Sequence, residues 1–107
     1  MAVSIHQNSY PQEEIKGAQV FYYTHSDEGK KAAEIMQESL LMLDETNHRK
    51  AKANDTYYLL KRTESPTIIV ECGFLSNTEE ADLLTQDEYR KKVADAIVEG
   101  IKAYMEK

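Results

Sequence analysis

Residues 66–77 decide the fold, and they read Pro-Thr-Ile-Ile-Val-Glu-Cys-Gly-Phe-Leu-Ser-Asn. The apolar run over 67–70 is typical of a strand that is covered on both faces. Glu71 ends this run, and Gly73 allows a sharp turn soon after it. Functional groups in a helix-flanked sheet gather at the carboxyl ends of its strands. We therefore expect Glu71 to lie at the rim of the sheet, where ligands bind.

The sequence on either side of this stretch alternates between strand and helix patterns. Runs of β-branched and aromatic residues predict further strands over residues 2–6, 17–23 and 56–60. Apolar spacings of three and four predict helices from a Ser26 cap to about Thr46, from about Thr78, and from a capping box at Thr85 and Glu88. The polar and basic residues 47–55 are expected to form an exposed loop. The alternation predicts an α/β fold with a mostly parallel sheet flanked by helices.

Composition limits the classes of protein to which the chain can belong. Its 107 residues suffice for one small domain. The formal net charge of -6 disfavours generic binding to nucleic-acid phosphates. Cys72 is the only cysteine, which excludes an internal disulfide and a cysteine-rich zinc site. No apolar run approaches the roughly 20 residues of a transmembrane helix, and we find no signal-peptide pattern. An enzyme and an interaction domain fit these features equally well.

Two side chains at expected strand ends are candidates for chemistry. His6 is either a histidine that bonds a backbone carbonyl or a metal ligand, because neutral imidazole is a common zinc ligand. Glu71 ends the most apolar strand, where a carboxylate costs free energy unless it is paired or lies in a cleft. It is either an acid that emerges into solvent or a general base whose pKa is raised by apolar surroundings. The two residues by themselves leave both choices open.

Two motifs resemble those of a known enzyme family. Residues 4–9, Ser-Ile-His-Gln-Asn-Ser, are similar to the "SIHAN" segment of the zinc-dependent N-acetylmuramoyl-L-alanine amidases. Residues 66–77 resemble the "P-x-x-L-V-E-x-G-F-L-S-N" stretch of the same family. Residues 16–23 and 57–61 also fit in order, so the resemblance covers essentially all 107 residues. It is nearest to the germination and sporulation amidases of spore-forming bacteria.

The resemblance implies a function and a set of site residues. His6 matches the last zinc ligand of the family, Glu71 matches its catalytic glutamate, and Asn8 matches a position that hydrogen-bonds substrate near the metal. The implied reaction is zinc-assisted hydrolysis of the amide between N-acetylmuramic acid and the L-alanine of the peptidoglycan stem peptide. The implied partners are the stem peptide and the glycan. The implied location is extracytoplasmic, at the cell wall.

The chain departs from the family pattern at the metal site. Two further family ligands, a histidine and a helical glutamate, precede the position of His6, and no residues match them here. A catalytic zinc site normally needs three protein ligands. We therefore expect residues 1–107 to be the C-terminal portion of an amidase catalytic domain, with weak or no zinc binding and little or no activity alone. Loss of the family's first strand is expected to expose a sheet edge, which favours homo-oligomers.

Alternatives to an amidase remain for the same residues. One is a non-catalytic remnant that binds peptidoglycan or a partner protein. Another is a hydrolase with Cys72 as its nucleophile, although a lone cysteine in an apolar strand is far more often inert packing. The basic side chains of Arg49, Lys50 and Lys52 either contact carboxylates of the stem peptide or form a solvated loop. The two remaining histidines are expected to be solvated; they are His25 and His48.

Overall fold

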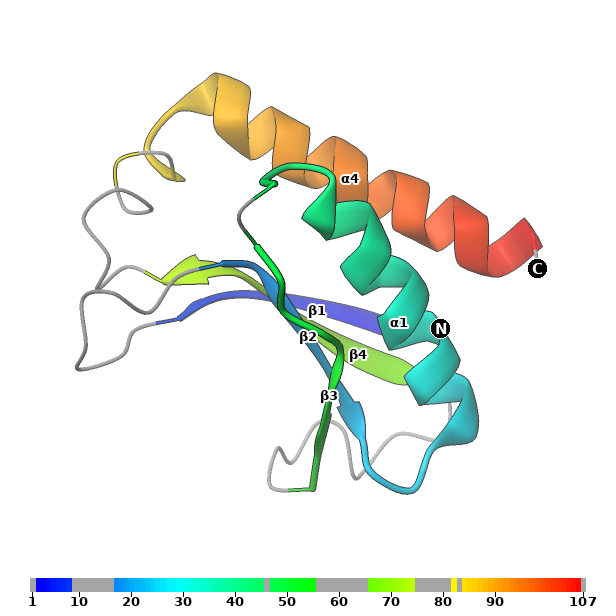
Figure 1. Ribbon diagram of the computed structural model, residues 1–107. Coiled ribbons are helices and arrows are strands. Elements are labelled where there is room, and N and C mark those ends of the chain that lie inside the picture. The colour runs from blue at the N-terminus through cyan, green and yellow to red at the C-terminus, as the bar shows by residue number, and fades with distance from the viewer. Residues whose placement is uncertain are drawn as a thin grey trace.

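Figure 1 shows the computed structural model, which describes residues 2–8, 17–45, 47–55, 66–74, 82 and 84–106. Within these residues four strands form one sheet in the order β1-β4-β2-β3. The strands are β1 (Ala2–Asn8), β2 (Gln19–Tyr23), β3 (Lys52–Asn54) and β4 (Thr67–Phe74). The helices are α1 (Asp27–Leu41) and α4 (Asp87–Glu106), and Figure 1 shows both on the same side of the sheet. The predicted α/β fold is confirmed.

Strand β4 lies inside the sheet, as its continuous apolar run predicts. It pairs in parallel with β1 and antiparallel with β2, and β2 pairs in parallel with β3. Two of these three pairs are parallel, in agreement with a mostly parallel sheet. Ile68, Ile69 and Val70 are all buried, although successive side chains of a strand point to opposite faces. Side chains on both faces of β4 are therefore buried.

Helix α1 begins where the sequence predicts. The Ser26 hydroxyl accepts a hydrogen bond of 2.9 Å from the backbone N–H of Gly29, which satisfies a donor that the first turn leaves unpaired. The helix ends at Leu41, about five residues before the predicted end. The next residues form tighter turns, in which the N–H groups of Leu43 and Asp44 bond to carbonyls three residues earlier.

A buried glutamine joins α1 to β2. The Gln37 Oε1 accepts a hydrogen bond of 2.8 Å from the N–H of Val20, and its Nε2 donates to the carbonyl of Ala18 over 3.0 Å. Gln37 is 3% exposed, so these bonds lie almost wholly away from water. Loss of the amide would leave two buried backbone groups short of partners. Gln37 therefore determines how the helix sits on the first residues of β2.

Helix α4 packs against α1 rather than directly against most of the sheet. Gly100 of α4 lies so close to Met36 of α1 that a Cβ on the glycine would be 2.5 Å from the methionine sulfur. The Ser39 hydroxyl donates a hydrogen bond of 2.6 Å to the carbonyl of Ala96. These contacts join the two helices on one face of the sheet. Their apolar side chains and those of β2 and β4 form the core, which includes Val20, Ala32, Ala33, Met36, Leu40, Ile68, Val70, Cys72, Val93 and Ile97.

Two local predictions were wrong. Residues 47–55 were expected to form a loop, but Lys52–Asn54 pair with Phe21–Tyr23 as the short strand β3. The side chains of Lys52 and Ala53 are exposed, so the strand is held by backbone pairing and carries no apolar pattern. The last helix begins at Asp87, and the Thr85 hydroxyl donates to the carbonyl of Asp82 instead of capping that helix.

Some predictions fall outside the residues that the structure describes. These are the strand over 56–60 and the start of the helix near Thr78. Among the helices that are described, none is both long enough and apolar enough to cross a membrane.

Candidate functional site

The alternation of β4 separates its core residues from Glu71. Ile68, Val70 and Cys72 belong to the core cluster that packs with the helices. Glu71 lies between Val70 and Cys72 in the sequence, so its side chain points to the opposite face of the sheet. Neither described helix covers that face (Figure 1). Strand β4 continues beyond Glu71 to Phe74, so the prediction that Glu71 ends its strand was wrong, because backbone pairing extends past the apolar run. Glu71 lies within the strand, on the face away from α1 and α4.

Three polar residues form one row across this face. Glu71 is the register partner of His6 on β1 and of Gln19 on β2. Register partners on adjacent strands project their side chains to the same face, about 5 Å apart along the row. The row His6–Glu71–Gln19 thus brings together residues from three separate parts of the chain. We call it the polar row.

Glu71 is in an environment that disfavours its charge. The residue is 4% exposed, and its Oε2 atom is a buried oxygen with no hydrogen-bond partner in the described structure. Burial raises the pKa of the Glu71 carboxyl, and the nearby charge of His6 offsets this effect only in part. A carboxyl group in these surroundings holds a proton more readily than an exposed one, and its unpaired oxygen can act as a general base.

His6 lies beside Glu71 and is exposed. Its Nε2 is 2.8 Å from the Ser4 hydroxyl, which is two residues earlier on the same face of β1. This contact limits the orientations that the His6 ring can adopt within the polar row. It involves a side-chain hydroxyl rather than the backbone carbonyl that the simpler interpretation of His6 expected. A histidine held in this way can act as a ligand or as a charged neighbour of Glu71.

Gln19 was not recognised as a site residue from the sequence. Its Oε1 accepts a hydrogen bond of 2.8 Å from Nη1 of Arg49, and its Nε2 donates to the carbonyl of Lys50 over 2.8 Å. These bonds join the polar row to the segment that follows α1. The signal available in the sequence was a single amide within an otherwise apolar strand, but only strand register shows that Gln19 lies next to Glu71.

The remaining predicted residues lie elsewhere or are only partly described. The backbone of Asn8 pairs with Phe74 at the end of β1, beyond a register shift after His6, and its side chain lies outside the described part. His25 packs edge-to-face on Tyr23 with ring centroids 5.2 Å apart, and it is exposed, as is His48. Cys72 is buried on the helix side of the sheet, so it does not share the face of the polar row.

The described residues alone do not fit a catalytic zinc ion. Such an ion takes three protein ligands. Within the described ranges, no cluster of three or more histidine, cysteine, aspartate or glutamate side chains has a geometry that would hold a metal. His6 offers one imidazole, and Glu71 offers one unpartnered oxygen beside it. This part of the chain thus contributes at most part of a zinc site.

Comparison with known proteins identifies the family of this chain. The family model of N-acetylmuramoyl-L-alanine amidases matches residues 1–103. The chain belongs to the N-acetylmuramoyl-L-alanine amidase family. It is 41% identical over 102 residues to the germination-specific amidase of Bacillus subtilis, which agrees with the resemblance to germination amidases. It is 30% identical over 102 residues to a probable cell wall amidase, LytH, of Staphylococcus saprophyticus.

Solved amidase structures share the fold of this family member. The CwlD amidase from Clostridioides difficile, solved in complex with the GerS lipoprotein, superposes with a TM-score of 0.94 at 43% identity and covers 97% of this chain. AmiC2 of Nostoc punctiforme superposes with a TM-score of 0.87 at 31% identity over 98% of the chain. The chain spans 53% of the CwlD chain, 43% of the Bacillus subtilis amidase and 34% of LytH. Its sheet and helices therefore correspond to about half of an amidase structure.

Proposed function

We propose that this chain is the C-terminal portion of a zinc-dependent amidase catalytic domain. Its substrate would be peptidoglycan, and the bond cut would join N-acetylmuramic acid to the L-alanine of the stem peptide. Family membership supports the reaction class. The single structural observation that supports it most is the placement of Glu71, buried with an unpartnered oxygen, next to His6 in the polar row.

In the proposed reaction, Glu71 is the general base. Water attacks the carbonyl carbon of the scissile amide while the Glu71 carboxylate takes one of its protons. The carboxyl then returns this proton to the amide nitrogen as the carbon–nitrogen bond breaks. The products are a free carboxylate on the muramic acid and a free amine on L-alanine. The raised pKa of Glu71 suits both steps, because the group has to hold the proton between them.

His6 is proposed as one zinc ligand, and Asn8 as a substrate contact at the end of the same strand. The other zinc ligands would have to come from outside the described residues. Because these ligands would be missing, we expect residues 1–107 produced alone to bind zinc weakly and to show little or no hydrolysis.

The test compares the protein encoded by the natural gene with its Glu71→Gln variant on purified peptidoglycan. Glutamine keeps the size of the side chain and cannot accept the proton. We expect release of L-alanine-terminated peptides by the wild-type protein and a loss of about 100-fold or more in the variant. Equal release by both proteins would show that Glu71 is not the base.

A second function is favoured by one observation, the absence of a three-ligand metal cluster within the described ranges. In this alternative the chain binds peptidoglycan or a partner protein without cleaving it. This alternative would be supported if the protein co-sediments with cell-wall sacculi and releases no peptides from them when zinc is added. In either case the site of action is the cell wall, which implies an extracytoplasmic location.

A further inference from the structure

We propose that Arg49, oriented by Gln19, binds the carboxylate of an acidic peptide substrate next to the amide on which Glu71 acts. The inference rests on the proposed function and adds a specificity-determining contact to it. Arg49 would be a binding residue, and Gln19 a positioning residue that acts through it.

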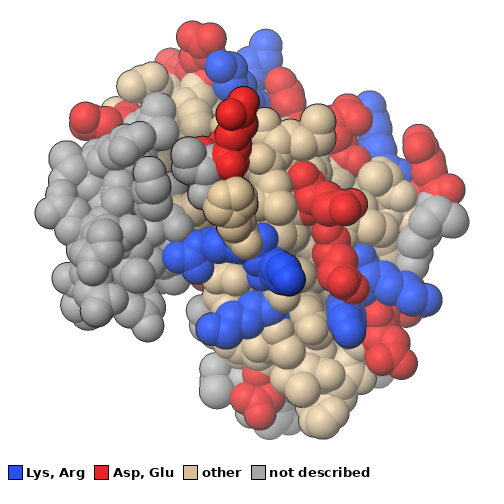
Figure 2. Space-filling view, viewed as in Figure 1, with Lys and Arg blue, Asp and Glu red and all other residues tan. Residues whose placement is uncertain are grey.

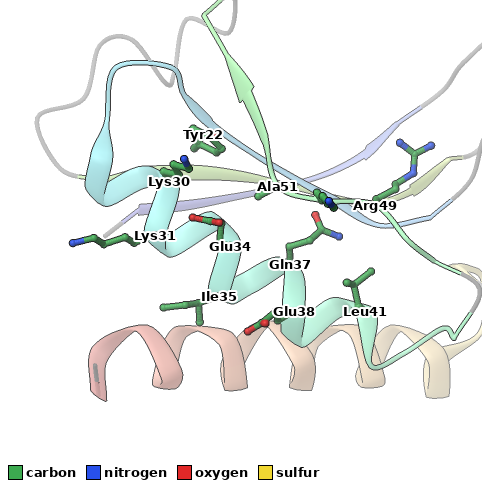
Figure 3. Close-up of a pocket in the computed structure, with 11 residues that line it drawn as sticks. Tyr22, Lys30, Lys31, Glu34, Ile35, Gln37, Glu38, Leu41, Arg49 and Ala51 are labelled. Atoms are coloured by element: carbon green, nitrogen blue, oxygen red, sulfur yellow. The ribbon is translucent and has the colours of Figure 1, made fainter.

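The guanidinium of Arg49 lies next to the polar row. Gln19 on β2 is the register partner of Glu71 on β4. Arg49 donates a hydrogen bond to the Oε1 of Gln19, so its guanidinium lies beside the member of the polar row that neighbours Glu71. Figure 3 shows the Arg49 side chain pointing away from α1, whereas Gln37 and Leu41 lie on the helix. Arg49 therefore reaches the face of the sheet that carries Glu71 and His6.

Several contacts hold Arg49 in place. The Asn47 side chain accepts from the N–H of Arg49 over 3.0 Å and donates to the carbonyl of Ala18 over 3.1 Å. Gly17 has a positive φ of 101°, and a Cβ there would lie 3.2 Å from Nε of Arg49 and 3.0 Å from the Asn47 amide oxygen. This close approach needs glycine. Arg49 is half-buried, unlike the exposed Lys50 and Lys52 beside it.

Negative charge near the site opposes the approach of an acidic peptide. Glu71 repels a second carboxylate whenever it is ionised, and the whole chain has a net charge of -6. An acidic peptide needs a cation at the site to offset this repulsion. A guanidinium presents a planar set of donors that matches a carboxylate in a two-bond geometry, and Gln19 limits the orientations that this plane can adopt.

The pocket between α1 and the segment around Arg49 is a weaker candidate for this anion. It has a volume of about 530 Å³, and Figure 3 shows the residues that line it. Lys30 and Lys31 stand beside Glu34 and Glu38 in its wall, so positive and negative charges partly cancel. Figure 2 shows the same mixture, with Lys and Arg side chains next to Asp and Glu side chains on this face. The guanidinium of Arg49 instead points away from these acids.

The test uses the protein encoded by the natural gene and two muropeptides. One has a free carboxylate on the residue after L-alanine, and in the other this carboxylate is amidated. For Arg49→Gln we expect the KM for the free-carboxylate muropeptide to rise about 10- to 100-fold, with kcat changed less than about 3-fold. The amidated muropeptide should be cleaved about as well as by the wild-type protein. A purely structural role for Arg49 would impair both substrates equally.

Two further variants keep the test decisive if Arg49→Gln folds poorly. Arg49→Lys keeps the positive charge but loses the planar guanidinium. Gln19→Ala keeps the guanidinium but removes the hydrogen bond from the Gln19 amide. Both should raise the KM for the free-carboxylate substrate alone, by less than Arg49→Gln does. Lys91→Gln is the matched control, because it removes one exposed positive charge from α4 on the other side of the sheet. It should change neither KM.

The outcomes separate the two proposals. Variants that affect both muropeptides equally, or neither, overturn the assignment of Arg49 while the amidase function stands. Wild-type protein that releases peptide from neither muropeptide overturns the proposed function itself, and the Arg49 assignment with it.

Discussion

His6 and Glu71 are register partners on the adjacent parallel strands β1 and β4, although most of the chain separates them in the sequence. Their side chains share the face of the sheet that α1 and α4 leave uncovered (Figure 1). Burial raises the pKa of Glu71, and the charge of His6 offsets part of this effect. The candidate site therefore depends on the pairing of β1 with β4.

Glu71 should make the stability of the protein depend on pH. Burial raises its pKa above the ordinary value of 4.5, so the folded state binds the proton more tightly than the unfolded state does. Its contribution to stability is then fully present below pH 4.5 and is lost as the pH rises through the folded pKa.

The measurement is urea unfolding of the wild-type protein and of Glu71→Gln, both free of metal, between pH 4.5 and 8. Glutamine does not ionise, so the variant should gain stability relative to the wild type as the pH rises. A stability difference that stays constant over this range would contradict a raised pKa.

Residues 1–107 produced alone should hold less than one equivalent of zinc. The described residues provide one imidazole and one carboxylate at the candidate site, and a stable catalytic site needs three ligands. Metal content after dialysis, measured by elemental mass spectrometry, checks this. His6→Ala should lower the zinc content of the protein encoded by the natural gene. One tightly held equivalent in residues 1–107 would refute the prediction.

Cys72 should be unreactive in the folded protein. Burial and, to a smaller extent, the charge of Glu71 raise the pKa of its thiol to about 11. At pH 7 only about one thiol in ten thousand is then ionised, and the thiolate is the nucleophile. A thiol reagent should label Cys72 slowly in buffer and rapidly in urea. Cys72→Ser should retain hydrolysis in an active preparation; loss of activity without unfolding would revive the cysteine-hydrolase alternative.

Gly100→Ala should destabilise the protein by about 1–3 kcal/mol, although alanine favours helices more than glycine does. The new Cβ would lie 2.5 Å from the sulfur and 3.3 Å from the Cα of Met36, and Met36 is 1% exposed. Chemical denaturation measures the change. In a Met36→Ala background the same substitution should cost less, because the clashing side chain is gone. Equal costs in both backgrounds would place the clash elsewhere.

The edge of β1 should promote self-association of residues 1–107. Within the described sheet β1 pairs only with β4, and Ile5 is 58% exposed beside an apolar groove lined also by Leu84, Val93, Ile97 and Val98. Light scattering at increasing concentration should show dimers or larger species, and Ile5→Lys should reduce them. Met42→Lys, at a residue that is 87% exposed on the turn after α1, is the control and should have little effect. A wild-type chain that stays monomeric would contradict this.

The sequence by itself determined the local elements and the candidate chemistry. The apolar run before Glu71 predicted an internal strand, and Ser26 predicted the start of α1, because both signals depend on neighbouring residues only. The motifs around His6 and Glu71 indicated the amidase family. These inferences needed no knowledge of which strand lies beside which.

Tertiary structure decided everything that depends on strand register and helix packing. Gln19 joins the site only because β2 pairs antiparallel with β4, and Arg49 only because its segment returns beside Gln19. Lys52–Asn54 form a strand through backbone pairing that exposed polar side chains do not reveal. Gln37 is buried in α1 because two backbone groups of another element bond to its amide. Such partners are distant in the chain, so no local pattern contains them.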